Sequence, residues 1–152
     1  MFRFSPLSLE DARQILSWRY PEPYDFYDAA SDPEDAALLL SEEYRQGRLF
    51  AVHDDEGILR GFLEFHLEAG ALEVGLGLRP QDTGRGLGPA FVDAGLTFGR
   101  ETFRPATFKL YVAAFNQRAI KVYERLGFRE VGRQMRHLLG RDWEFIEMRR
   151  PA

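Results

Sequence analysis

Apolar residues alternate with polar or small residues from Leu72 to Leu78, which is the period-two pattern of a β-strand. We expect this strand to end before Pro80, because proline offers no backbone N–H to a sheet. After Pro89, apolar residues recur at steps of three and four, a spacing that is typical of an amphipathic helix. The predicted buried face of that helix carries Leu87, Phe91, Ala94 and Phe98. A glycine-rich turn at residues 83–88 connects the strand to the helix.

The same criteria divide the rest of the chain into short strands and helices. Further strands are predicted at residues 2–4, 49–52, 58–67 and 108–112, followed by a hairpin of residues 128–138 and 143–149 around Gly140-Arg141-Asp142. Ser8 is the predicted N-cap of a helix that ends before Pro21. Two more helices are expected at residues 116–126 and at residues 34–46, the latter with inward positions at Ala37, Leu38, Leu40 and Tyr44. No linker or repeat interrupts the sequence, so we expect one domain, residues 1–152.

The glycine-rich turn reads Thr83-Gly84-Arg85-Gly86-Leu87-Gly88-Pro89. Glycine lets the backbone turn tightly and brings its N–H groups close to a ligand, and the N-terminus of the following helix attracts anions. The pattern therefore predicts a phosphate-binding site, although a simple tight turn is also compatible with it. The spacing is not the G-x-G-x-x-G of a dinucleotide-binding fold, and no Gly-Lys-Ser/Thr follows, as a nucleoside-triphosphate loop requires.

A second motif lies in residues 115–128, where the pattern N-x-x-A-x-x-x-Y-x-x-x-G-F is met at Asn116, Ala119, Tyr123, Gly127 and Phe128. It resembles the closing motif of the GNAT family of acyl-CoA-dependent N-acetyltransferases. The glycine turn is similar to the same family's Q/R-x-x-G-x-G/A pyrophosphate motif, with Thr83 in place of the usual Gln or Arg. The two motifs cover residues 72–128. Together they imply the GNAT fold, a mixed α/β arrangement with a mostly antiparallel central sheet flanked by helices. The expected order is strand-helix-helix-strand-strand-strand-helix-strand-helix-strand-strand.

The resemblance implies how the co-substrate, acetyl-CoA, is held. Main-chain groups along the pantetheine arm and the acetyl carbonyl would be those of Leu76, Gly77 and Leu78. The turn begins at Thr83, and the backbone N–H groups at the pyrophosphate would belong to Gly84, Arg85, Gly86, Leu87 and Gly88. The Arg85 side chain is compatible both with a phosphate contact and with a solvent-facing position. Asn116 would contact the arm and is also a candidate helix N-cap.

Two residues are candidates for proton transfer. Tyr123 follows Asn116 by seven residues, which returns to the same helix face, and the resemblance makes Tyr123 the general acid for the leaving thiolate. A core tyrosine is the alternative. Some family members place a glutamate base on the fifth strand, where this chain has Tyr111. Glu73 interrupts an apolar run and is our candidate base, acting through a water, with a solvent-facing strand position as the alternative. Weaker candidates are Glu64 and Glu68.

The composition narrows the choice of chemistry. The chain has no cysteine, which excludes disulfides and thiolate metal sites, and its three histidines lack metal-type spacing, so no metal is expected. Residues 1–56 hold 13 acidic and 5 basic side chains, whereas residues 57–152 hold 11 acidic and 15 basic side chains and contain both motifs. The overall charge of −4 does not favour nucleic-acid binding. No membrane span or signal peptide is predicted, so a cytoplasmic location is expected.

An aromatic segment at residues 18–27 follows the first predicted helix, and it is similar to a Trp-x-Tyr-x-x-Pro-Tyr-x-Phe-Tyr segment in some bacterial members of the family. The resemblance implies that this segment lies on the acceptor side of the cleft. Aromatic faces beside carboxylates suit a cation. The candidate acceptor-binding residues are Trp18, Tyr24, Asp25 and Tyr27. The alternative is that these aromatic side chains only pack the helices onto the sheet.

The sequence therefore predicts an acetyl-CoA-dependent N-acetyltransferase that acts on a primary amine, either a small metabolite or a peptide amine. A non-catalytic acyl-CoA-binding or regulatory module on the same fold is the alternative. Tyr123 favours the enzyme, whereas Thr83 and the absent fifth-strand glutamate favour the module. Because dimers are frequent in the family, the resemblance also allows a homodimer.

Overall fold

The structure is a computed structural model that describes residues 1–152. Its strands are β1 (Arg3–Pro6), β2 (Leu49–His53), β3 (Leu59–Glu68), β4 (Ala71–Leu78), β5 (Thr107–Ala113), β6 (Arg129–Leu138) and β7 (Arg141–Pro151). Its α-helices are α1 (Leu9–Leu16), α2 (Pro33–Leu40), α3 (Glu42–Arg45), α4 (Gly88–Phe103) and α5 (Gln117–Arg125). The 3-10 turns are η1 (Tyr24–Tyr27), η2 (Ala29–Ser31) and η3 (Pro80–Asp82). The predicted order of strands and helices is confirmed, except that the second predicted helix is divided into α2 and α3.

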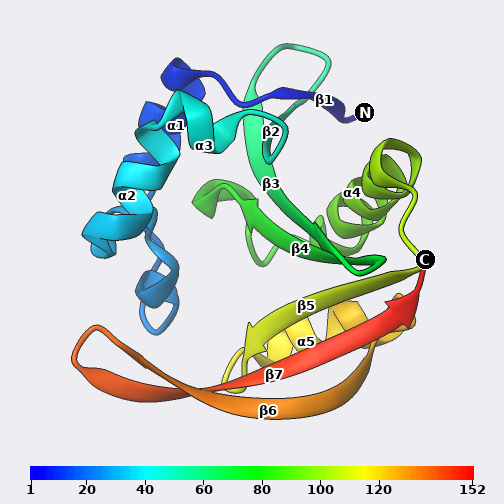
Figure 1. Ribbon diagram of the computed structural model, residues 1–152. Helices are drawn as coiled ribbons and strands as arrows, with labels where there is room; N and C mark the ends of the chain where they lie inside the picture. Colours follow the sequence, from blue (N-terminus) through cyan, green and yellow to red (C-terminus); the bar gives the residue numbers. More distant parts are fainter. The chain divides into compact units, whose positions relative to one another are not determined.

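The seven strands follow the order β1-β2-β3-β4-β5-β7-β6 in a mixed sheet. Strands β4 and β5 run parallel, whereas β1-β2, β2-β3, β5-β7 and β7-β6 are antiparallel, as expected for a mostly antiparallel sheet. The chain forms two compact units, one of residues 1–64 and 76–83 and the other of residues 65–75 and 84–152. Strands β3 and β4 contribute residues to both units (Figure 1). That residues 1–152 make one domain stays a prediction.

In the first unit, short capping side chains determine where the helices begin and end. Ser8 caps α1 as predicted, and its hydroxyl accepts a hydrogen bond from the backbone N–H of Asp11. The predicted helix over residues 34–46 is wrong, because Ser41 has an extended backbone. Ser41 ends α2 and caps α3, its hydroxyl accepting from the backbone N–H of Tyr44. A serine side chain that accepts a hydrogen bond from a backbone N–H of the next turn can therefore interrupt a run of good helix formers.

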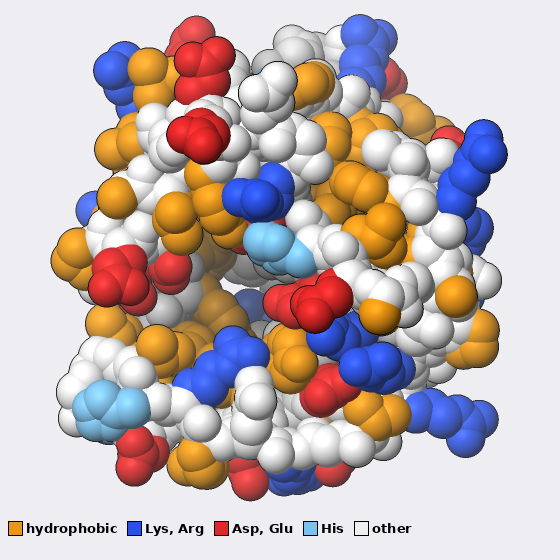
Figure 2. All heavy atoms as spheres, in the orientation of Figure 1, with side chains coloured by type: hydrophobic (Ala, Val, Ile, Leu, Met, Phe, Trp, Pro, Cys, Tyr) orange, Lys and Arg blue, Asp and Glu red, His pale blue; other side chains and the backbone are white.

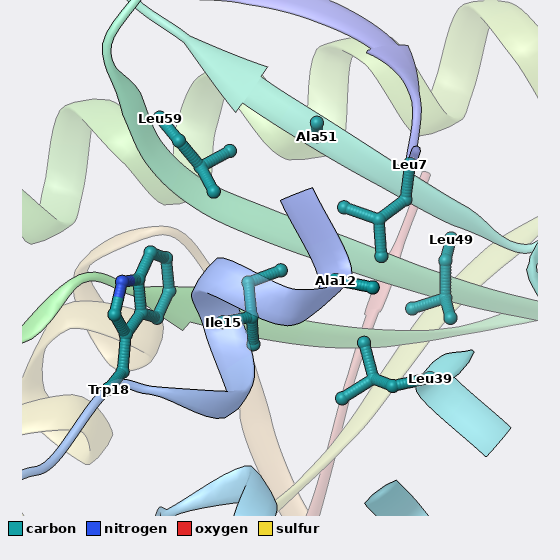
Figure 3. Packing of buried hydrophobic residues seen from close by; sticks show 8 residues of the cluster. All are labelled: Leu7, Ala12, Ile15, Trp18, Leu39, Leu49, Ala51 and Leu59. Carbon is teal, nitrogen blue, oxygen red and sulfur yellow. The ribbon is translucent and has the colours of Figure 1, made fainter. Parts of the chain in front are cut away.

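The core of the first unit lies between α1, α2 and the strands β2 and β3 (Figure 3). Its buried apolar side chains are Leu7, Ala12, Ile15, Trp18, Leu39, Leu49, Ala51 and Leu59. The predicted inward positions Ala37, Leu38 and Leu40 are wrong, because these residues are exposed and Leu39 is buried instead. The fourth predicted position, Tyr44, is partly buried and packs against this core. Because α2 ends at Ser41, it has only eight residues, and only one of its leucines, Leu39, is buried in the core.

The second unit is built around β5 and β7, which pair over seven residues from Thr107–Pro151 to Ala113–Phe145. Alternate residues of these strands are buried on one face: Phe108, Leu110, Val112, Ile146 and Met148. Helix α5 runs along β5 and β7 (Figure 1). The Arg150 guanidinium ties β7 to the end of α5 by donating 2.7 Å to the Leu126 carbonyl. Burial of alternate strand residues beneath a helix is the usual consequence of period-two patterning.

Helix α4 is buried along a stripe displaced by about one residue from the predicted one. The buried residues are Phe91, Val92, Gly95, Leu96 and Gly99, whereas Ala94 and Phe98 are half-buried and Leu87 is exposed. The cause is the close approach at Gly99, where a Cβ atom would lie 2.9 Å from Cε1 of Phe65 and 3.2 Å from Cδ2 of Leu72. Glycine therefore lets this face of α4 approach Phe65 of β3 and Leu72 of β4 closely, and apolar spacing alone does not reveal this approach.

The turn between β6 and β7 lies one residue earlier than predicted. Leu138 pairs with Arg141, and the two connecting residues, Leu139 and Gly140, both have positive φ. Two residues of positive φ match the right-handed twist of a hairpin, whereas the predicted Gly140-Arg141-Asp142 turn would have unpaired two residues of β7.

Charged side chains of both signs lie among hydrophobic ones on the face seen in Figure 2. Such mixing is ordinary for a folded protein, because polar atoms alone cannot cover its surface. None of the helices has the length and apolar composition needed to cross a membrane.

Candidate functional site

The glycine turn is exposed and leads directly into the first turn of α4. Gly84 and Gly86 have φ values of 71° and 77°, and both are exposed. Helix α4 begins at Gly88 with Pro89 in its first turn, and Leu87 at the N-cap provides no side-chain hydrogen bond. The first N–H groups of a helix have no intrahelical acceptor, and a leucine at the N-cap has no side-chain oxygen that could accept hydrogen bonds from them. A bound anion would supply the missing acceptor.

Helix α5 lies beside this turn. A Cβ atom at Gly84 would lie 3.4 Å from Nη1 of Arg118, and one at Gly88 would lie 3.6 Å from Cγ2 of Val122. Arg118 and Val122 are four residues apart, so they share one helix face. Arg118 was not among the site residues predicted from the sequence. Arg118 lies two residues after the motif residue Asn116, which was the only indication of a role in the sequence. Sequence spacing does not show where the side chain of an exposed arginine points.

The motif residues Asn116 and Tyr123 belong to α5. The Asn116 side chain caps the helix by accepting 3.2 Å from the backbone N–H of Ala119, which confirms the N-cap interpretation. The Tyr123 ring is half-buried and meets the buried Phe128 ring edge-on, with centroids 6.0 Å apart. This contact fixes the direction of the phenol, as a general acid requires and as a packing role also would.

Glu73 lies in the parallel pairing of β4 with β5, opposite Lys109. Its neighbours Leu72 and Val74 are buried, and Glu73 is half-buried. Tyr111, where some family members have glutamate, lies beneath cations, with the Arg136 guanidinium 4.6 Å and the Lys109 ammonium 5.8 Å from its ring centroid.

In the first unit, the end of β4 is anchored by the aromatic segment. The Tyr20 hydroxyl donates 2.7 Å to the carbonyl of Leu78, and the Tyr20 backbone N–H donates 2.9 Å to Asp28. Burial and then the charge of Asp28 raise the pKa of Tyr20, so the hydroxyl stays protonated as a donor. At Gly77, a Cβ atom would overlap the Phe62 ring. Thr83 uses its hydroxyl locally, donating 2.8 Å to the carbonyl of Pro80.

The predicted acceptor residues divide into two groups. Trp18 is buried in the core, 6.3 Å from the Phe62 ring, which supports the packing alternative for this residue. Tyr24, Asp25 and Tyr27 form the 3-10 turn η1, where Asp25 and Tyr27 are exposed and Tyr24 is half-buried. This turn, which the sequence analysis did not predict, therefore presents an aromatic ring and a carboxylate to solvent.

A cluster of acids lies on β3 and α2 of the first unit. Glu64 accepts a hydrogen bond from the Tyr44 hydroxyl. Burial, followed by the hydrogen bond and charge of Glu64, raises the pKa of Tyr44. Burial and the charges of Asp32, Glu64 and Glu34 raise the pKa of Asp35. The Glu64 carboxylate is thus already engaged as a hydrogen-bond acceptor for the Tyr44 hydroxyl. No group of three or more His, Asp or Glu side chains has the arrangement of a metal site.

Comparison with protein families finds that residues 2–129 match the model of the acetyltransferase (GNAT) domain. The mycothiol acetyltransferase of Salinispora arenicola is 42% identical over 88 residues, which cover 54% of this chain and 28% of that protein. The chain therefore spans less than a third of the length of this relative. The spermidine N(1)-acetyltransferase of Vibrio cholerae is 26% identical over 129 residues, covering 82% of this chain and 72% of that protein.

The solved structures agree on the fold. A chimera based on the Vibrio cholerae spermidine N-acetyltransferase has a TM-score of 0.80 at 21% identity, covering 97% of this chain and 93% of that chain. A GNAT-family acetyltransferase from Bacillus anthracis has a TM-score of 0.73 at 16% identity, covering 99% of this chain and 94% of that chain. Since the family match extends over most of the sequence and includes both motifs, the chain belongs to the GNAT family of acetyltransferases.

Proposed function

We propose that the protein transfers the acetyl group of acetyl-CoA to a primary amine of a small metabolite or of an exposed peptide. The observation that carries this proposal is the glycine turn at the N-terminus of α4, which lies beside the helix that carries Asn116 and Tyr123. Family membership supports the reaction class. A homodimer and a cytoplasmic location, both expected from the sequence, stay predictions.

The turn would hold the coenzyme mainly through backbone groups. N–H groups of residues 84–88 would bind the pyrophosphate, and the α4 dipole favours an exposed anion by about 0.3–1 kcal/mol. The Arg118 guanidinium, next to Gly84, would add a charge-assisted contact, and Arg85 lies within the turn itself. Backbone groups of Leu76, Gly77 and Leu78, together with Asn116, are proposed for the pantetheine arm.

The chemistry is a direct attack of the amine nitrogen on the thioester carbonyl carbon. The C–N bond forms, the C–S bond breaks, the amine loses a proton, and the coenzyme leaves as a thiolate that gains one. We assign the proton for the thiolate to Tyr123, because a phenol hydroxyl can act as the general acid for a leaving thiolate. Glu73 is proposed as the base that accepts the amine proton through a water.

The experiment that tests this function is an incubation of the protein with acetyl-CoA and a panel of primary amines, with free thiol as the readout. We expect thiol release that depends on both the amine and the protein, with acetylated amine identified by mass spectrometry. Acetyl-CoA binding without thiol release for any amine would instead identify a non-catalytic acyl-CoA-binding module. Absence of acetyl-CoA binding would exclude both functions.

Within the panel, we expect cationic amines to be better acceptors than anionic ones. Turn η1 carries Tyr24, Asp25 and Tyr27, and residues 1–56 are strongly acidic. The similarity to a spermidine acetyltransferase supports a cationic acceptor. Asp25→Asn should raise the KM of a cationic amine by about two- to fivefold, the size of an exposed charge pair, and salt should reduce the difference. Steady-state kinetics at low and high salt measure it.

Glu43→Gln is the matched control, because Glu43 is an exposed acid of the same unit outside the aromatic segment. Its KM should equal that of the wild type. If anionic amines are the best acceptors, or if Asp25→Asn and Tyr24→Ala both leave KM unchanged, η1 does not recognise a cation.

A further inference from the structure

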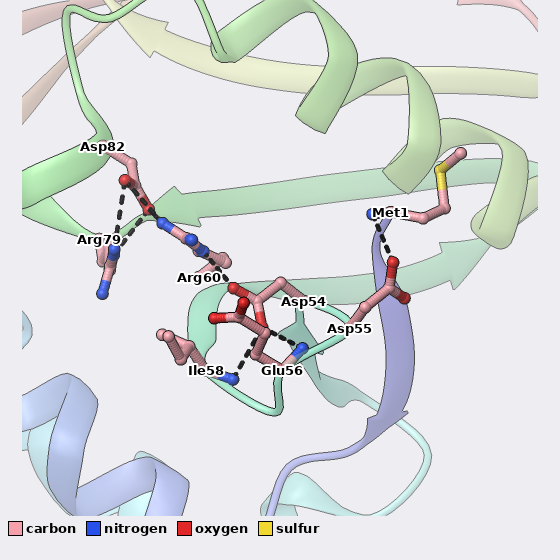
Figure 4. A network of polar contacts seen from close by, with 8 residues as sticks. All are labelled: Met1, Asp54, Asp55, Glu56, Ile58, Arg60, Arg79 and Asp82. Carbon is pink, nitrogen blue, oxygen red and sulfur yellow. Dashed lines mark hydrogen bonds and ion pairs between the residues drawn. The ribbon is translucent and has the colours of Figure 1, made fainter.

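A buried carboxylate lies directly before the glycine turn. Asp82, in η3, is only 1% exposed, and its two oxygens face two guanidinium groups (Figure 4). Arg79 donates to it from Nε at 2.6 Å and from Nη2 at 3.4 Å. Arg60 donates from Nη1 to both oxygens, at 3.0 and 3.1 Å. We call these three residues the Asp82 clamp.

The clamp connects segments that are far apart in the sequence. Arg60 belongs to β3, Arg79 directly follows β4, and a second carboxylate, Asp54, accepts 2.9 Å from Nε of Arg60. Asp54 is itself held in the turn between β2 and β3, where it accepts from the backbone N–H groups of Glu56 and Ile58 (Figure 4). The Arg79 N–H also donates 2.8 Å to the carbonyl of Arg60. The end of β4 is thus tied to β3 by main-chain and side-chain bonds together.

Asp82 is ionised in this setting. Burial opposes its charge most strongly, but the hydrogen bonds and charges of Arg79 and Arg60 together outweigh burial and hold the pKa of Asp82 below its ordinary value of 3.8. Stability alone does not require such a cluster, because buried ion pairs can often be replaced by apolar side chains without loss. What the pairs do provide is a definite geometry for the chain that they hold.

We propose that Asp82, through Arg60 and Arg79, is a positioning residue for coenzyme binding. The inference rests on the proposed function. Residues 76–78 are the proposed contacts of the pantetheine arm, and Thr83 begins the proposed pyrophosphate turn. The clamp lies between these two stretches in the sequence, where the Asp82 N–H donates 3.0 Å to the Arg79 carbonyl and the Thr83 N–H donates 3.2 Å to the Pro80 carbonyl. Without the clamp, acetyl-CoA would have to order this segment when it binds.

The test is Asp82→Asn, which keeps the shape of the side chain but removes its charge and places an amide donor against guanidinium donors. We expect the KM and Kd of acetyl-CoA to rise by about tenfold or more, in line with the loss of hydrogen bonds to charged groups, while kcat at saturation stays within about twofold. Arg79→Gln should give a similar rise, and the double variant should add little to it, because both changes remove the same interaction. If Asp82→Asn does not fold, Arg79→Gln carries the test, because Arg79 is partly exposed.

Two controls separate positioning from stability. Asp55→Asn removes two exposed ion pairs of the same β2–β3 turn, with the N-terminal ammonium and with Arg3, and should leave KM unchanged. Leu39→Ala removes a core side chain of the same unit and should lower Tm without changing KM. If Leu39→Ala raises KM as much as Asp82→Asn, the clamp has only a structural role and the inference is wrong.

Hydrogen exchange provides a readout without the coenzyme. In the apo protein, Asp82→Asn should speed amide exchange in residues 76–83 more than elsewhere in the first unit. Unchanged exchange and unchanged KM would overturn the inference while the wild type still releases thiol, so the proposed function would stand. If the wild type fails to bind acetyl-CoA, the proposed function fails, and the inference about binding fails with it.

Discussion

Tyr123→Phe is expected to lower kcat by about 10²-fold or more while the Kd of acetyl-CoA stays within about twofold. The substitution removes only the hydroxyl, so the edge-on contact of the ring with Phe128 is retained. If the phenol protonates the leaving thiolate, the loss must appear in the chemical step. Because the ring remains in place, coenzyme affinity should hold. Free-thiol kinetics with a good acceptor give kcat, and isothermal titration gives Kd.

Tyr111→Phe is the matched control for this experiment. Tyr111 is also half-buried, and its ring lies under the Arg136 guanidinium, a contact that phenylalanine can keep. We expect its kcat to equal that of the wild type. A Tyr123→Phe enzyme with an unchanged rate would return Tyr123 to a packing role, leaving the family assignment intact and the general acid unidentified.

Gly86→Val should abolish coenzyme binding. No atom lies within 4 Å of a Cβ built at Gly86, so a valine meets nothing in the apo protein, but it would project from the exposed turn where the pyrophosphate must approach. In the wild type, acetyl-CoA at one hundred times its Kd stabilises the fold by about 2.7 kcal/mol, which is a rise in Tm of roughly 5–10 °C for a chain of this size. The variant should show no such rise.

The positive φ of Gly86 also makes valine strained, and strain alone would lower the Tm of the apo protein. Gly140→Val is the control, because Gly140 has a φ of 78°, a similarly open surrounding and a place in the turn between β6 and β7. Both variants should lose a similar amount of apo stability, but only Gly86→Val should lose the response to acetyl-CoA. A Gly86→Val protein that binds as tightly as the wild type would exclude the turn as the pyrophosphate site.

Patterns that depend on neighbouring residues could be predicted from the sequence. The alternation at residues 72–78 gave β4, Ser8 and Asn116 were identified as N-caps, and Pro89 marked the start of α4. The two sequence motifs alone indicated the family. These features are determined locally, because a strand's period, a capping hydroxyl and a proline act within a few residues.

The tertiary structure decided the features that depend on residues distant in the sequence. The buried stripe of α4 follows from the close approach of Gly99 to Phe65 and Leu72, and the place of Arg118 at the site follows from its proximity to Gly84. The Asp82 clamp joins Arg60 to a carboxylate twenty-two residues away, and no periodicity announces such a pair. Local pattern thus determined the elements and the family of this protein. Which side chains meet across those elements was decided by packing and electrostatics, because both depend on distance in space and not on distance along the chain.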